Sequence, residues 1–243
     1  MTETVTAILL ILGTATPIVG GIALAATEHL GSVSSGPEDS SVNLVVRRWT
    51  FRMASIAMLL ALFGFALLST PLRDADEETL STVALVGFLL AAIGWLLEMT
   101  VTSSVGEVAA KDAAKTGAVP GYWEPIRHWV NVSLQQVYVT VGLIALALYG
   151  RLLLITGLTP AWAAWTTIGM SIFWFVLAII FALVLKVEDA LFIPAVLLLP
   201  PVVIGVGTLV NSWAGGTVPW RSERNSVTDN VVAELEAAHI PEA

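Results

Sequence analysis

Four polar side chains follow one another at helical spacing in the middle of the chain. They are His128, Asn131, Gln135 and Tyr138, at positions i, i+3, i+7 and i+10. On an α-helix these positions share one face, and Tyr138 lies about 15 Å along the axis from His128. In a membrane such a stripe has to face protein or water, because lipid cannot satisfy its hydrogen bonds. The stripe therefore indicates either the wall of a solute vestibule or hydrogen bonding between helices.

A second group of polar residues falls near the predicted inner ends of the first and third apolar segments. Its members are Glu28, His29, Glu98 and Thr102. Glu98 shares a helical face with Trp95 and Thr102 and is expected at the inner membrane interface. If these acids converge with His128, they predict a site coupled to protons or cations. The alternative is a set of unrelated interfacial charges that lipid headgroups solvate.

Residue types that bind cofactors are scarce. The chain has no cysteine, which excludes disulfides, thiolate metal sites and iron–sulfur clusters. Its three histidines leave little for an imidazole-rich site, so we predict no metal. A haem held by His29 and His128 is the one alternative, but both residues end predicted helices and no attachment motif accompanies them. We therefore predict no cofactor.

The composition of the chain indicates that these polar residues belong to a membrane protein. Of the 243 residues, 56% are hydrophobic and 12% are charged, whereas a soluble domain carries about 25% charged residues. This shortage of charge is typical of an integral membrane protein, so the lipid bilayer is the first predicted partner. The net charge of −8 argues against a nucleic-acid partner, which would require a basic surface.

A helix that crosses a bilayer needs about 20 mostly apolar residues, and six segments meet this requirement. They are residues 4–27, 49–69, 80–101, 132–155, 161–185 and 190–210. Lys186, Glu188 and Asp189 separate the last two segments. We interpret these charges as a tight hairpin at one membrane face, because charges at mid-depth are costly; an intramembrane ion site is the alternative. The predicted fold is all-α, a polytopic bundle of six transmembrane helices.

Basic residues set the predicted orientation, because short loops rich in Lys and Arg stay in the cytoplasm. Seven lie in the first, third and fifth loops, namely Arg47, Arg48, Arg52, Lys111, Lys115, Arg127 and Lys186. Four lie on the other side, namely Arg73, Arg151, Arg221 and Arg224. Both termini are therefore predicted outside, in the plasma (cytoplasmic) membrane. Residues 1–213 form the transmembrane domain, with a helical cytoplasmic hairpin at about 102–131, and 214–243 form a short extramembrane tail.

Three further patterns concern the ends and the breaks of the predicted spans. Arg47, Arg48 and Arg52 are candidates for contact with anionic lipid headgroups. Pro17, Pro200 and Pro201 are candidates for helix breaks, either as simple kinks or as the broken helices found at many transporter sites. Seven tryptophans near predicted span ends are typical of an interfacial aromatic belt: Trp49, Trp95, Trp123, Trp129, Trp162, Trp213 and Trp220.

Three functional hypotheses follow from these patterns. The polar stripe and the prolines favour a small-solute or ion permease or a channel-like protein. The lack of deeply buried charges favours a non-catalytic subunit or scaffold of a larger membrane complex, whose partners would be other membrane subunits or further copies of this chain. A lipid-modifying membrane enzyme is the third hypothesis, built on Glu28, His29, Glu98 and His128. No nucleotide-binding, hydrolase or metalloprotease motif is present, so the sequence leans away from an enzyme.

Overall fold

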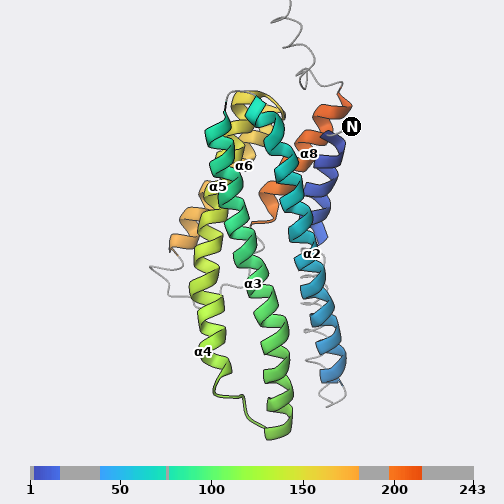
Figure 1. The fold of residues 1–243 in the computed structure, drawn as a ribbon, viewed down its shortest axis with the longest axis vertical. Helices are drawn as coiled ribbons and strands as arrows, with labels where there is room; N and C mark the ends of the chain where they lie inside the picture. Colours follow the sequence, from blue (N-terminus) through green and yellow to red (C-terminus); the bar gives the residue numbers. More distant parts are fainter. Residues whose placement is uncertain (1–2, 17–38, 75–76, 181–196, 215–243) are drawn as a thin grey trace, which may run out of the picture.

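The described part of the chain is built from helices. The computed structural model describes residues 3–16, 39–74, 77–180 and 197–214, and every element in these ranges is helical (Figure 1). The elements are the N-terminal helix Glu3–Thr16, α2 Asp39–Asp74, α3 Glu78–Thr116, α4 Trp123–His128, the π-helix η1 Trp129–Leu134, α5 Gln135–Thr156, α6 Ala161–Ile180 and α8 Leu199–Trp213. The predicted all-α class is therefore confirmed for these residues.

Four helices are long and apolar enough to cross a membrane. They contain the segments Phe51–Arg73, Glu78–Ala113, Gln135–Thr156 and Ala161–Ile180. These segments match the second to fifth predicted spans, and they identify the chain as an integral membrane protein. The first and sixth predicted spans are described only in part, as the shorter helices Glu3–Thr16 and Leu199–Trp213. The count of six spans and the sidedness of the termini remain predictions.

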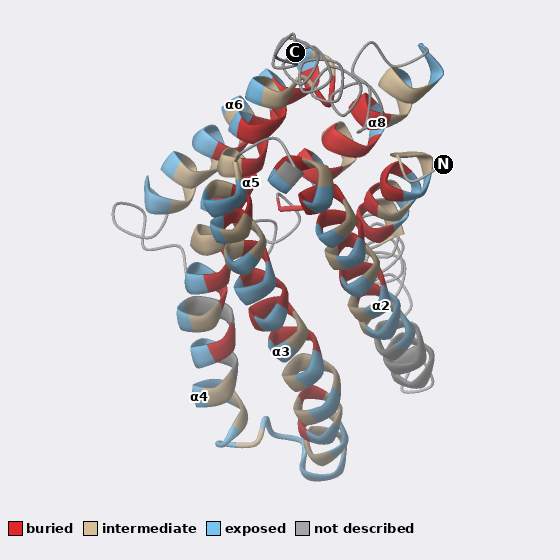
Figure 2. Cartoon of the chain, turned by 45° about the horizontal axis from the view of Figure 1, so that its top comes forward, coloured by how far each residue is buried: buried red, intermediate tan, exposed pale blue. Residues whose placement is uncertain are grey.

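The four long helices run side by side in alternating directions. In Figure 1 the end of α2 and the start of α3 lie at the top of the bundle, as do the end of α5 and the start of α6. The connection between α3 and α4 lies at the bottom. α3 packs against both α2 and α5, and α5 also packs against α6. The buried residues lie on the faces where these helices meet (Figure 2).

The N-terminal helix packs tightly between α2 and α8. A Cβ atom added at Gly13 would lie 2.4 Å from the backbone nitrogen of Ala61 on α2. On the other side, a Cβ atom at Gly205 of α8 would lie 2.8 Å from Cγ1 of Ile11. Both contacts are too short for any residue but glycine, so small residues let these backbones approach closely, as is common in membrane helix packing.

The outward faces of the spans are apolar. α6 buries only small side chains, namely Ala163, Ala164, Thr167 and Ser171. Several of its large side chains point outward, and Trp165 and Phe173 are 60% and 59% exposed. In water such a face would be unfavourable, whereas lipid tails are as apolar as these side chains. The surface of α6 therefore fits a lipid or protein environment within a membrane.

Helix α3 continues well past the predicted span end at residue 101. It ends at Thr116, where Gly117 takes a left-handed conformation (φ 73°) and donates its N–H to the carbonyl of Ala113. Beyond the turn, the Tyr122 hydroxyl donates to Oδ2 of Asp112 at 3.0 Å. The hydrogen bond between Tyr122 and Asp112 joins the residue before α4 to the last turns of α3. The connection between the two helices is therefore fixed at its α3 end and at its α4 end.

The paired prolines of the last predicted span lie in the first turn of a helix. We expected Pro200 and Pro201 near the centre of a span over 190–210, but they occupy the first turn of α8, directly after a turn at 197–198. Proline suits this place, because N–H groups of the first turn have no intrahelical acceptor and proline lacks one. The two prolines therefore begin α8, and because residues 181–196 lie outside the described residues, the predicted helix break stays a prediction.

Several sequence predictions fall outside the described residues. The kink at Pro17 follows the last described residue of the N-terminal helix. Glu28 and His29 lie in the range 17–38, and the charged turn with Lys186 lies in 181–196. Most of the tail, 215–243, is also outside.

The tryptophans separate into two classes. Trp49, Trp129 and Trp162 are between 50% and 57% exposed, and Trp213 is 77% exposed, as an interfacial belt requires. Trp95 is different, because its side chain is only 4% exposed and belongs to the core. Its predicted place in the belt is therefore wrong. The prediction used only its distance from a span end, and α3 does not end there.

Candidate functional site

A buried carboxyl group lies between the third and fifth helices. Glu98 of α3 is 5% exposed, and Tyr138 of α5 is 2% exposed. The Tyr138 hydroxyl donates a hydrogen bond to Oε2 of Glu98. The bond joins residues 40 positions apart in the chain. It brings together one member from each of the two polar groups that the sequence singled out.

A glycine makes this contact possible. Gly94 lies one turn before Glu98 on α3, and a Cβ atom there would lie 2.5 Å from Cβ of Tyr138. No side chain fits in that space, so the hydrogen atom of Gly94 is what allows the tyrosine to lie against α3. The absence of a side chain at this one position sets how deeply the Tyr138 hydroxyl reaches toward Glu98.

Trp95 completes the cluster and brings an unused donor. Its ring meets the Tyr138 ring edge-on, with centroids 6.2 Å apart and an interplanar angle of 67°. The indole Nε1 is buried and has no hydrogen-bond partner among the residues that the structure describes. A buried donor without an acceptor is costly, and such groups are rare in proteins. We call Gly94, Trp95, Glu98 and Tyr138 the carboxyl cluster.

The carboxyl group has no basic partner within the described ranges. Lys111 pairs with Glu107, at 2.6 Å on the exposed end of α3, and not with Glu98. Arg52 of α2 is exposed, and its guanidinium lies 5.7 Å from the centre of the Trp49 ring. Burying an ionised carboxylate without a positive partner costs several kcal/mol as an order of magnitude. An ionised carboxylate at this site is therefore energetically unfavourable.

The polar stripe predicted from residue 128 to residue 138 is interrupted. The π-helix η1 occupies Trp129–Leu134, between His128 and Gln135. A π-helix bonds i to i+5 instead of i+4, so residues before and after it do not keep the α-helical register. His128 is exposed, whereas Gln135 is 5% exposed and buried beside Tyr138. The side chain of Asn131 lies outside the described set.

The remaining candidates do not gather at this cluster within the described part of the chain. Thr102 is half-buried, one turn beyond Glu98 on α3. Glu28 and His29 are not described, and His128 is exposed on α4 while Glu98 is buried on α3. The side chains of Arg47 and Arg48 are likewise not described, and only Arg52 is seen, exposed, at the predicted headgroup site.

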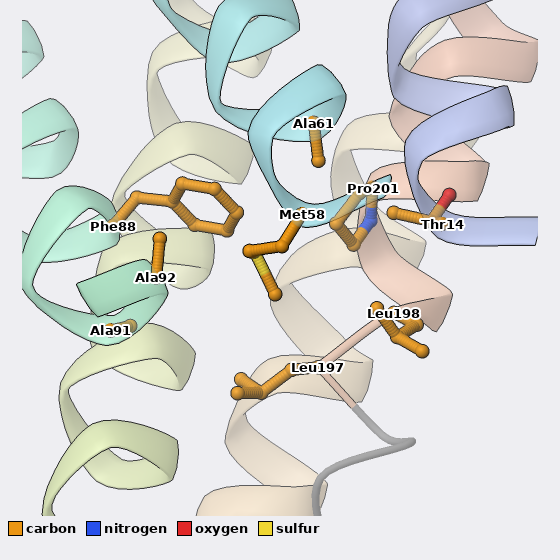
Figure 3. A pocket seen from close by; sticks show the side chains of 9 residues that line it. All are labelled: Thr14, Met58, Ala61, Phe88, Ala91, Ala92, Leu197, Leu198 and Pro201. Carbon is orange, nitrogen blue, oxygen red and sulfur yellow. The ribbon is translucent and has the colours of Figure 1, made fainter. Parts of the chain in front are cut away.

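An apolar cavity touches α3 at Ala91, two helical turns before Glu98. It opens between the N-terminal helix, α2, α3 and α8, and Thr14, Met58, Phe88 and Pro201 are among its lining residues (Figure 3). Its volume is ≈ 10 Å³ for the centre of a water-sized sphere, about the minimum that holds one water molecule. Because the lining is apolar, the cavity offers a water few hydrogen bonds and no room to a larger solute.

A second buried tyrosine was not singled out from the sequence. Tyr149 of α5 is fully buried, and its hydroxyl lies 2.8 Å from the Ser69 hydroxyl of α2. Its ring packs 4.6 Å from the ring of Phe65, which in turn lies 4.2 Å from that of Phe88. We call these four residues the upper aromatic cluster. The usable signal was the spacing of 11 residues between Tyr138 and Tyr149, three turns on one helical face.

Metal ligands are not concentrated anywhere in the described ranges. No group of three or more His, Cys, Asp or Glu side chains there is placed to hold a metal ion. The carboxyl cluster contributes one carboxyl group, one hydroxyl group and one indole. Its chemistry is that of hydrogen bonding and proton exchange.

Comparisons with known protein families, with curated proteins and with solved structures found no match for this chain. The functional argument therefore rests on the membrane-spanning helices and on the geometry of the carboxyl cluster.

Proposed function

We propose that this integral membrane protein is a permease or channel-like protein that moves a small ion, or a small solute together with an ion. Glu98 is the group that binds the ion. The observation that carries this proposal is a carboxyl group buried within a helix long enough to span the membrane, with one tyrosine as its hydrogen-bond partner.

The cost of such a group is the reason to assign it a role. An ionisable residue within a span is unfavourable unless it is paired, and such residues commonly mark ion and proton pathways. A hydrogen bond that served only to hold α3 against α5 would be cheaper with two neutral partners. The upper aromatic cluster shows such a neutral pair in the same bundle, between Ser69 and Tyr149.

The packing favours a small transported species. The apolar cavity beside α3 holds about one water molecule at most. Trp95 and Tyr138 fill the space around Glu98, and both are buried. The space at Glu98 therefore admits only a small ion in this state. A larger solute could enter only if the helices moved apart.

Ion flux into liposomes tests the proposal. The purified protein is reconstituted, and internal dyes report proton, sodium and potassium entry under an imposed gradient. We expect flux above that of empty liposomes, abolished by Glu98→Gln, which keeps the shape and removes the charge. Glu78→Gln is the matched control, because Glu78 is an exposed acid at the start of the same helix. Equal flux in liposomes with the wild type, in liposomes with Glu98→Gln and in empty liposomes would contradict the proposal.

A second candidate function is a non-catalytic subunit of a larger membrane complex. The observation that favours it is the outward face of α6, which carries large exposed side chains such as Trp165 and Phe173. Native mass spectrometry of the protein, gently extracted from its own membrane, tests this candidate. Other chains in fixed stoichiometry would support it, and a monomer or homo-oligomer that conducts ions would exclude it.

A further inference from the structure

We infer that the species bound at Glu98 is a proton, exchanged between the carboxyl group and water, and neither a metal cation nor a solute. The inference deepens the proposed function, because it names the ion at the same site. It also stands apart from it in one respect, since a carboxyl group can bind and release a proton whether or not the chain conducts.

The first argument is volume. The Tyr138 side chain touches the backbone of α3 at Gly94, where even a methyl group would lie only 2.5 Å from its Cβ. Trp95 covers the cluster edge-on and is 4% exposed. A sodium ion or a solute needs space that this packing does not contain. A proton is the one ligand that adds a bond to a carboxylate without adding volume.

The second argument is the number of ligands. Hard cations take about six or more oxygen ligands in proteins, several of them carboxylate or carbonyl groups. The cluster provides one carboxyl group and one phenol, and the described ranges contain no group of three or more His, Cys, Asp or Glu side chains placed to hold a metal ion. A single carboxyl group is sufficient for a proton and insufficient for a metal cation.

The third argument is that the hydrogen bond survives both protonation states. The Tyr138 hydroxyl donates to the ionised carboxylate, and it can accept from the protonated acid by rotating its own hydrogen. The pair therefore stays bonded as the proton arrives and leaves. An aliphatic partner would leave the acid unsatisfied, and a lysine would hold it permanently ionised.

The unused indole of Trp95 indicates where the site can change. Its buried N–H has no acceptor among the described residues, although its ring contacts Tyr138. A water molecule that enters beside the indole would give this donor an acceptor, and such a water could carry the proton to or from Glu98. The cluster thus holds two buried donors, the hydroxyl of Tyr138 and the indole N–H of Trp95, and only the first is used in the present state.

The charged surroundings of Glu98 are sparse on every packed helix that the structure describes. Tyr138 is the titratable group that faces it from α5. On α2, Arg52 is exposed and lies over Trp49, and on α4 His128 is exposed. No described basic side chain is within salt-bridge distance of the carboxyl group, so its protonation is governed by burial and by Tyr138.

Infrared spectroscopy of the full chain in lipid tests the inference. The C=O stretch of a protonated, buried carboxyl group is followed while pH is raised, at low salt and then with added sodium or potassium chloride. We expect one carboxylic-acid band that disappears reversibly with pH, at the same midpoint in both salts. The band should be absent in Glu98→Gln and retained in Glu78→Gln. Tyr138→Phe should keep the band and shift its frequency, because the protonated carboxyl group loses its hydrogen bond to the Tyr138 hydroxyl.

Each other outcome overturns the inference. A midpoint that shifts as sodium or potassium is added means that a metal cation competes for Glu98. A Glu98 band that is absent at every pH means that no proton exchanges there. The result is separable from the flux assay: a titrating band in a chain that conducts nothing leaves the proton site standing and ends the permease proposal. If Glu98→Gln abolishes flux but no band titrates, the permease proposal stands and the proton site is ruled out.

Discussion

Two tyrosines of the same helix, three turns apart, meet different partners. Tyr149 bonds to Ser69 of α2, whose own hydroxyl donates to the carbonyl of Phe65 at 2.9 Å. The donors and acceptors of this pair are all neutral. Tyr138 bonds to Glu98 of α3, a group that can ionise, beside the indole of Trp95, whose N–H has no partner among the described residues.

The contrast shows that residue type and burial do not decide the role of a polar side chain in a membrane. Both tyrosines are almost completely buried on the same face of α5. In the upper aromatic cluster each polar group is satisfied, and the surrounding rings fill the space. In the carboxyl cluster a costly group is retained with a single bond. We therefore expect the first cluster to contribute stability and the second to contribute function.

The largest expected effect is in the upper aromatic cluster. Phe65→Ala removes a fully buried ring that contacts Phe88 and Tyr149, and such truncations cost about 3–5 kcal/mol. Thermal unfolding in detergent, followed by tryptophan fluorescence, measures the loss. Phe63→Ala on the same helix is the control, since Phe63 is 63% exposed and should change little. Surviving folded protein should keep the Glu98 infrared band, and loss of that band would mean that the clusters are coupled.

The second effect is a steric change in the carboxyl cluster. Gly94→Ala places a methyl group 2.5 Å from Cβ of Tyr138, which overpacks the contact and should cost about 1–3 kcal/mol. The same change should move Tyr138 away from Glu98 and shift the infrared band. Gly169→Ala is the matched control, because an added Cβ at Gly169 meets no atom within 4 Å. Equal stability of the two variants would contradict the close contact.

The third effect separates the two tyrosines by pH. Tyr149→Phe removes one neutral hydrogen bond and should cost about 1 kcal/mol at every pH. Tyr138→Phe takes the donor from Glu98, and its cost should rise to about 1.5–3 kcal/mol as higher pH ionises the carboxyl group. Unfolding midpoints of both variants over a series of pH values provide the check. A cost of Tyr138→Phe that stays constant with pH would mean that Glu98 does not change its charge.

The smallest effect lies outside both clusters. Lys111→Ala breaks the exposed i,i+4 pair with Glu107 and should cost about 0.5 kcal/mol or less, an effect that added salt reduces. The variant should leave both the flux and the infrared band unchanged. A large effect on flux would point to the hairpin of α3 and α4 as a functional part and would weaken the assignment to Glu98.

Much of the architecture was predictable from local patterns. Four of the six predicted spans match helices of sufficient length and apolar character. Glu98, Gln135 and Tyr138 were candidates because polar residues stand out in apolar helices. One error has a local cause: Trp95 was assigned to the interface from its distance to a predicted span end, whereas α3 continues beyond that point. The helix break at Pro200 and Pro201 stays a prediction, because residues 181–196 lie outside the described residues.

The pairing of Glu98 with Tyr138 could not be read from the sequence. Hydrophobic length reports that a helix crosses a membrane, because burial in lipid depends on each segment alone. The contact depends on how α3 and α5 are rotated and how closely they approach. The π-helix before Gln135 changes the rotation of α5, because it shifts the helical register. The missing side chain of Gly94 allows the two helices to approach closely. Rotation and approach are both relations between segments. The membrane helices are therefore predictable from local sequence, whereas the carboxyl cluster is determined only by how the helices pack.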